Sequence, residues 1–258
     1  MQLSSAMFPA LPALAMFLCI LLFLEVGRRI GVKRLNVPGA RAGVGVVDGS
    51  VYALVALLIG FSFNGAAGRF DQRRMLVGET TNAAGTAWQR IDMLPPALQP
   101  PVRDGMRRYL DALIAEYRSA AWTQGQTEER AALMRAQNSL WSSSVATCLL
   151  PEGEKARMLL LPSLNELFGN VEKEQQARNL HPPRLIYVVL IVATMIGAIF
   201  VGYAIATVNK RNWIYMLGIA GTIASATYVI AELEYPRHGR VRMDATDWTL
   251  TDLRKTMN

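Results

Sequence analysis

Four residues between positions 57 and 68 recur at intervals of three or four, and their types suit the wall of an ion pathway. Leu57, Phe61, Asn64 and Gly68 share one face of a helix at this spacing, and Gln72 continues it. The face begins apolar, gains an amide at Asn64 and ends polar at Gln72. Repeated around an axis, such a face forms a hydrophobic gate that closes by dewetting, followed by a polar lining. Leu57, Phe61, Asn64 and Gly68 are therefore candidates for a pore and its gate.

Positive charges follow this face directly. Arg69 and Arg73 come within five residues of Gly68 and would raise the concentration of anions at a pore mouth. Two plainer interpretations compete with this one. Arginines that end a membrane span often extend toward lipid phosphates, and the small residues from Gly60 to Gly68 also suit close helix packing without a pore. The sequence leaves both alternatives open.

Motifs of known catalytic sites are absent from the sequence. There is no phosphate-binding glycine loop ending in Lys-Ser/Thr, no His-Glu-x-x-His and no Gly-x-Ser-x-Gly. The two cysteines, Cys19 and Cys148, lie far apart and belong to no Cys/His cluster with metal-ligand spacing. We expect no catalytic residues, no metal site and no cofactor, and therefore not an enzyme.

Four long apolar stretches must position the candidate pore residues. The chain has 258 residues, of which 52% are hydrophobic and only 18% charged, which is unusual for a soluble protein. A helix needs roughly 20 apolar residues to cross the hydrocarbon core. The stretches that meet this length are 7–26, 49–68, 185–208 and 213–231. A multi-pass protein in a lipid bilayer is the expectation, and since Lys and Arg flank the spans on both sides, orientation stays open.

The middle of the chain is different, because charged residues alternate there with apolar residues at helical spacing, as in 102–117. We expect an all-α membrane protein with no β-strands. Its predicted parts are two spans and a basic linker (1–68), an extramembrane helical domain (69–184), a transmembrane hairpin (185–233) and a polar C-terminal tail (234–258). The net charge of +7 is spread over span edges and the mixed-charge middle, so we do not expect nucleic acid as a partner.

Several short segments carry a resemblance to a known family. These are the Gly60-Phe61 pair with the small residues after it, RFDQRR at 69–74, ETTNAAGTA at 79–87, RIDMLP at 90–95 and ELEYPRHG at 232–239. With the order of two spans, helical middle and two spans, the sequence resembles the bacterial bestrophin-like domain family over nearly its whole length.

The resemblance extends distantly to true bestrophins, which are pentameric anion channels with a narrow neck lined by the second span. Matched through the Gly-Phe pair, the neck positions would be Ala53, Leu57 and Phe61. Because Ala53 and Leu57 are smaller than the bulky residues of a bestrophin neck, we expect a looser constriction centred on Phe61. No acidic run resembles the bestrophin calcium clasp.

The resemblance thus implies a homo-oligomer, pentameric in bestrophins, in the bacterial inner membrane that passes small inorganic ions passively and prefers anions such as chloride. The alternative is a membrane-anchored scaffold or sensor whose helical middle binds a protein partner and which has no pore.

Overall fold

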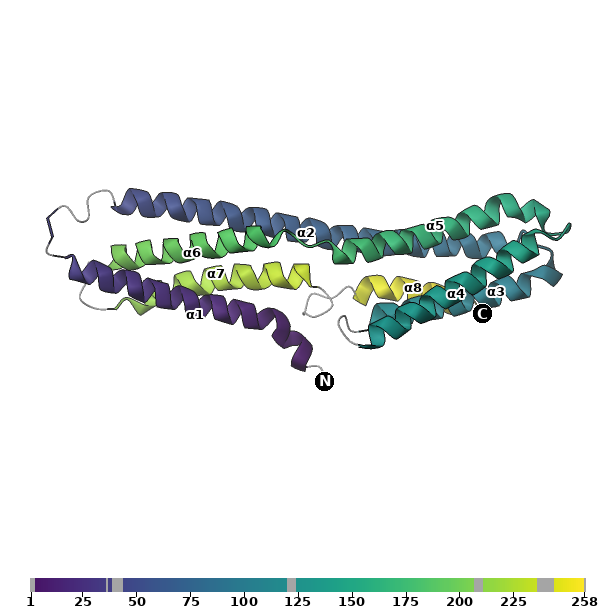
Figure 1. Ribbon diagram of the computed structural model, residues 1–258, viewed down its shortest axis with the longest axis horizontal. Coiled ribbons are helices and arrows are strands. Elements are labelled where there is room, and N and C mark those ends of the chain that lie inside the picture. The colour runs from purple at the N-terminus through teal and green to yellow at the C-terminus, as the bar shows by residue number, and fades with distance from the viewer. Residues whose placement is uncertain are drawn as a thin grey trace. The chain divides into compact units, whose positions relative to one another are not determined.

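The computed structural model describes residues 3–35, 37–38, 44–119, 124–206, 211–235 and 244–257, and this part of the chain is helical without strands. The expected all-α fold is confirmed (Figure 1). The helices are α1 (Leu3–Lys33), α2 (Val44–Ile91), the 3₁₀ turn η1 (Pro96–Leu98), α3 (Gln99–Arg118), α4 (Gln124–Cys148), α5 (Glu154–Asn179), α6 (Arg184–Ile205), α7 (Trp213–Glu234) and α8 (Asp244–Thr256).

Four stretches of these helices are long and apolar enough to cross a membrane. They are Ala10–Lys33, Gly45–Ile91, Glu154–Ile205 and Trp213–Glu234. The third stretch runs through α5 into α6, and α6 contains most of the apolar residues expected at 185–208. The protein is therefore a multi-pass membrane protein, as its sequence predicts.

Helix α2 is much longer than the span predicted within it. It runs for 48 residues as a single element, because no proline occurs between Val44 and Ile91 and the stretch after Arg69 consists largely of residues that a helix tolerates. The change from apolar to charged sequence at Arg69 is a change of environment, and the backbone continues through it.

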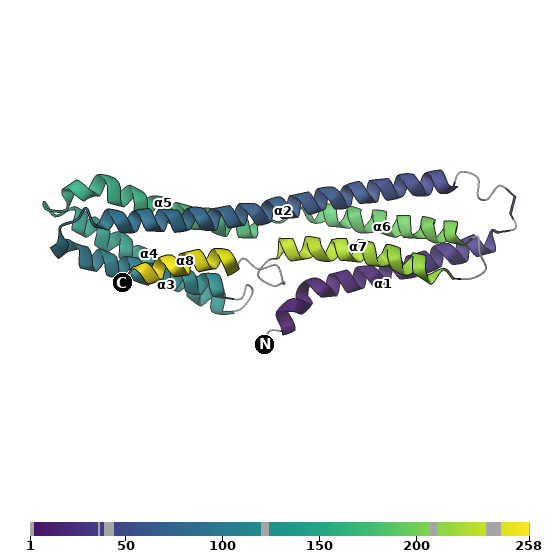
Figure 2. The same ribbon diagram turned by 180° about the vertical axis from the view of Figure 1, so that it is seen from behind.

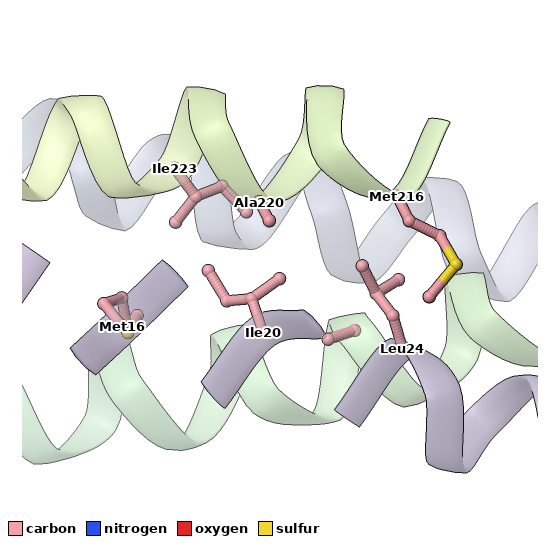
Figure 3. Packing of buried hydrophobic residues seen from close by; sticks show 7 residues of the cluster. Met16, Ile20, Leu24, Met216, Ala220 and Ile223 are labelled. Atoms are coloured by element: carbon pink, nitrogen blue, oxygen red, sulfur yellow. The ribbon is translucent and has the colours of Figure 1, made fainter. Parts of the chain in front are cut away.

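The chain divides into two compact units, which we describe separately. The first contains Met1–Phe70 and His181–Val241, and the second contains Asp71–Leu180 and Arg242–Asn258. In the first unit, α6 and α7 run alongside α1 in both views (Figures 1 and 2). The buried cluster between these helices consists of Met16, Ile20, Leu24, Ala198, Met216, Ala220 and Ile223 (Figure 3).

Glycines bring α1 and α6 into backbone contact. A Cβ built on Gly27 would lie 1.9 Å from the carbonyl oxygen of Ile199, and one built on Gly202 would lie 2.1 Å from that of Leu24. One turn after Gly27, a Cβ on Gly31 would lie 2.5 Å from the Cβ of Ala206. The Gly27-x-x-x-Gly31 spacing is typical of helix pairs that pack closely in membranes.

The second unit has its own core, built from α3, α4, α5 and α8. In this unit, Arg178 forms ion pairs with Glu116 and Glu174, whose side chains are almost fully buried. The guanidinium donates to both Glu116 oxygens, at 3.1 and 3.0 Å, and to Glu174 at 2.8 Å. Burial alone would lower the pKa of Arg178, but the attraction of Glu174 and Glu116 outweighs it and raises the pKa.

The C-terminal segment differs from the polar tail expected at 234–258. Its residues 244–256 form α8, in which Leu250 is fully buried. After α8, the backbone oxygen of Met257 accepts a hydrogen bond from Arg107 Nε at 2.7 Å, and Arg254 pairs with Asp111 at 2.8 Å. The segment packs within the second unit because its leucines and Met257 recur at helical spacing.

Candidate functional site: the exposed face of helix α2

The five expected pore residues lie on one exposed face of α2. Ala53, Leu57, Phe61, Asn64 and Gly68 are all exposed, and 66% of the Phe61 surface is accessible. The opposite side of the same helix turns inward, since Val55 and Ala66 are buried. Spacing alone therefore identified a face that the rest of the described chain leaves uncovered. That this face lines a pore stays a prediction.

The glycines of this face do not serve packing inside the chain. A Cβ built on Gly60 or Gly68 would meet no described atom within 4 Å. At Gly65, in contrast, the neighbour is the Arg69 guanidinium, whose Nη1 lies 3.2 Å from the built Cβ. At Gly60 and Gly68, close helix packing would therefore require a second chain, whereas Ala66 is already buried within this chain.

Arg69 follows the exposed face and pairs with Glu234, the last residue of α7. Its Nε and Nη2 donate to Glu234 Oε2 at 3.0 and 2.8 Å. The other oxygen of that carboxylate lies 2.9 Å from His181 Nδ1, and the His181 ring lies 5.2 Å from the ring of Tyr235. Glu234 is 2% exposed. Much of the Arg69 charge is thus balanced by a buried carboxylate.

Sequence reasoning did not connect these three residues. Neither Glu234 nor His181 was among the site residues predicted from the sequence. No short-range signal links them, since Arg69 and Glu234 are 165 positions apart. The nearest clue is that Arg69 and Glu234 both end a span and His181 comes just before one.

Arg73, the other arginine expected at a pore mouth, is buried within the chain and does not lie on the exposed face. Only 3% of its surface is accessible. Its Nε donates to the backbone oxygen of Ala177 at 3.2 Å, and its Nη2 lies 3.5 Å from that of Leu180. These carbonyls belong to the end of α5, where a helix leaves its last oxygens without intrahelical partners and favours a positive charge. Arg73 therefore caps α5.

Farther along α2, in the second unit, the polar residues Glu79 and Asn82 are also exposed. Glu79 forms no ion pair with the residues that the structure describes. Within the same described ranges, no three His, Cys, Asp or Glu side chains gather closely enough to hold a metal ion. The polar residues exposed on α2 thus include Asn64 in the first unit and Glu79 and Asn82 in the second.

Comparison with known proteins agrees with this architecture. The family model of the Bestrophin-like domain matches residues 10–246. A search of curated proteins gave no match. Among solved structures, the chain is similar to a point-mutated bacterial bestrophin homolog from Klebsiella pneumoniae, with a TM-score of 0.62 and 17% identity, over 94% of this chain and 98% of that one. The fold is therefore that of a bestrophin, and the chain belongs to the Bestrophin-like domain family.

Proposed function

We propose that this protein is an oligomeric ion channel of the bacterial inner membrane, with a pore lined by α2. Small inorganic ions pass it passively, anions in preference to cations. The supporting observation is the exposed face of α2, which changes from Leu57 and Phe61 to the amide of Asn64. An amide side chain is unfavourable on a face that contacts lipid, because transfer of a polar group into hydrocarbon costs free energy.

Helix α1 provides the comparison inside the same unit. Between positions 10 and 22, the exposed side chains of α1 include Leu11, Leu14, Leu18 and Leu22, and none of the exposed residues there is an amide or a charged residue, as expected for a surface that contacts acyl chains. The exposed face of α2 has a phenylalanine, two glycines and an asparagine within nine residues of helix. The two faces are therefore suited to different surroundings, α1 to lipid and α2 to a water-filled path.

The mechanism follows from a ring of such faces. A ring of Phe61 side chains narrows the path to a hydrophobic constriction, which stays closed while it is dry and conducts when it wets. Asn64, one turn farther along, offers both N–H donors and an oxygen acceptor to an ion that leaves the constriction. A ring of five copies is the number that the resemblance to bestrophins implies, and closed rings are the usual result of head-to-tail contacts.

The test combines assembly with conduction. Native mass spectrometry of the full-length protein, extracted with retained lipid, should give a ring of about five copies, following the resemblance to bestrophins. In planar bilayers, Phe61→Ala should raise the single-channel conductance, because the constriction loses its phenyl groups. Phe63→Ala is the matched control, since Phe63 is also exposed but lies on a different face of α2.

Two results would contradict the proposal. A monomer or dimer leaves no axis for a pore and favours the alternative of a membrane-anchored scaffold or sensor. Equal conductance of wild type, Phe61→Ala and Phe63→Ala in an intact ring would remove Phe61 from the gate.

A further inference from the structure

One carboxylate near the end of α1 holds three arginines. Arg28 donates to both oxygens of Glu25, each at 2.9 Å, and Arg29 Nε donates to Oε1 at 2.9 Å. Arg211, just before α7, donates to the same Oε1 at 3.2 Å. Three positive charges therefore converge on one negative charge. The cluster of Glu25, Arg28, Arg29 and Arg211, which we call the basic cluster, therefore has an excess of two positive charges among the residues that the structure describes.

Two of these guanidinium groups remain accessible. The side chains of Arg29 and Arg211 are 68% and 46% exposed, and each donates a single N–H to Glu25. An arginine has five N–H donors in a planar fork that suits phosphate oxygens. Most donors of both side chains are thus available to a second anion that approaches from outside.

An apolar track on α1 leads to the basic cluster. Leu18, Leu22 and Val26 are exposed at four-residue intervals, and Arg29 continues the same face. At the start of α7, Trp213 is exposed and lies 5.7 Å under the guanidinium of Arg211. Tryptophan is enriched at this depth because its ring prefers the boundary between acyl chains and water. A free phosphate ion would use the arginines alone, whereas the track also fits an acyl chain.

We propose that the basic cluster binds the phosphate headgroup of an anionic glycerophospholipid, with phosphatidylglycerol as the test case, while an acyl chain lies along Leu18, Leu22 and Val26. The charge excess selects an anionic lipid over a zwitterionic one, since the latter brings its own positive group to the site. The site is independent of the proposed pore, because its residues belong to α1, to the segment just before α7 or to the first residue of α7, and none belongs to α2.

The test is lipid titration of the full-length protein in detergent, with the bound lipid counted by native mass spectrometry. Wild type should bind phosphatidylglycerol more tightly than phosphatidylcholine. An arginine near an anionic lipid surface contributes about 1 kcal/mol, roughly a fivefold change in binding, so Arg29→Gln with Arg211→Gln should weaken phosphatidylglycerol binding about thirtyfold. Arg184→Gln is the matched control, since Arg184 is an exposed arginine at the start of α6 and is not part of the basic cluster.

Each other outcome overturns the proposal. Equal binding of the two lipids by wild type, or unchanged phosphatidylglycerol binding in the double variant, leaves no selective site. An equal loss in Arg184→Gln means that charge anywhere on the protein acts. Displacement of the lipid by millimolar inorganic phosphate assigns the cluster to a soluble anion. If the double variant does not fold, Arg29→Gln alone decides, with roughly a fivefold loss expected and no loss refuting the site.

Discussion

Replacing Gly27 by alanine should push α1 and α6 apart. The added Cβ would lie 1.9 Å from the carbonyl oxygen of Ile199, which is 1.5 Å short of the 3.4 Å at which ordinary contact begins. That oxygen belongs to the backbone of α6 and cannot turn away as a side chain would. The two helices therefore have to separate where Ile20 and Leu24 are buried.

The clash at Gly27 should lower the free energy of unfolding. One extra methyl group in a well-packed interior costs typically 1–3 kcal/mol, and we expect about 3 kcal/mol because the obstacle is backbone. The assay is unfolding of the full-length protein in mixed micelles of increasing SDS fraction, followed by circular dichroism. Gly218→Ala is the control, since no described atom lies within 4 Å of its added Cβ. A helix gains up to about 1 kcal/mol from that change.

Replacement by alanine should thus lower the stability of the protein at Gly27 and leave it equal or raise it at Gly218. Earlier unfolding of Gly27→Ala, together with equal or later unfolding of Gly218→Ala, agrees with the crossing of α1 and α6. If Gly27→Ala unfolds at the same SDS fraction as wild type, the close approach of these helices is not the native packing.

Two further predictions concern charge. Arg178→Met removes the guanidinium that Glu116 and Glu174 share, and loss of one partner of a buried pair costs about 3–5 kcal/mol. Thermal unfolding followed by near-UV circular dichroism should show this loss of stability at pH 7. The loss should shrink on acidification, because protonated carboxyls carry no buried charge. A loss of stability that persists unchanged in acid would contradict the explanation. Glu234→Gln removes the charge opposite Arg69, so the pore that we propose should become more anion-selective in the reconstituted protein, seen as a shifted reversal potential in a chloride gradient. A conducting variant with the wild-type reversal potential would show that Arg69 is remote from the path.

The membrane spans were predictable because a bilayer dictates their length. Nothing comparable limits a helix in water, so the sequence did not show that α2 extends from Val44 to Ile91. The C-terminal helix α8 was missed for a related reason. It is short, and its packing against the second unit depends on Leu250 and Met257 contacting residues far away in the sequence.

Helical spacing predicted which residues of the candidate site share a face. The contacts that its arginines make with residues far away in the sequence were not predicted. Helical periodicity alone places Leu57, Phe61 and Asn64 on one face, and the structure leaves that face exposed. An arginine after a span has the same local pattern whether it meets water, a lipid phosphate or a carboxylate, so the partners of Arg69 and Arg73 were not predictable. The Gly27-x-x-x-Gly31 spacing is a local signal that could have predicted the close packing of α1 against another helix.

The charges on α2 limit how strongly a pore lined by this helix can select anions. Arg69 lies within hydrogen-bond distance of Glu234, and the field of such a pair falls with distance faster than that of a single charge. Arg73 is directed at the carbonyl oxygens of α5. Glu79, in contrast, is exposed and unpaired among the described residues, and five copies would repel anions. Asn64 serves ions of either sign. We therefore expect the constriction at Phe61 to govern conductance, and we expect the proposed preference for anions over cations to be weak.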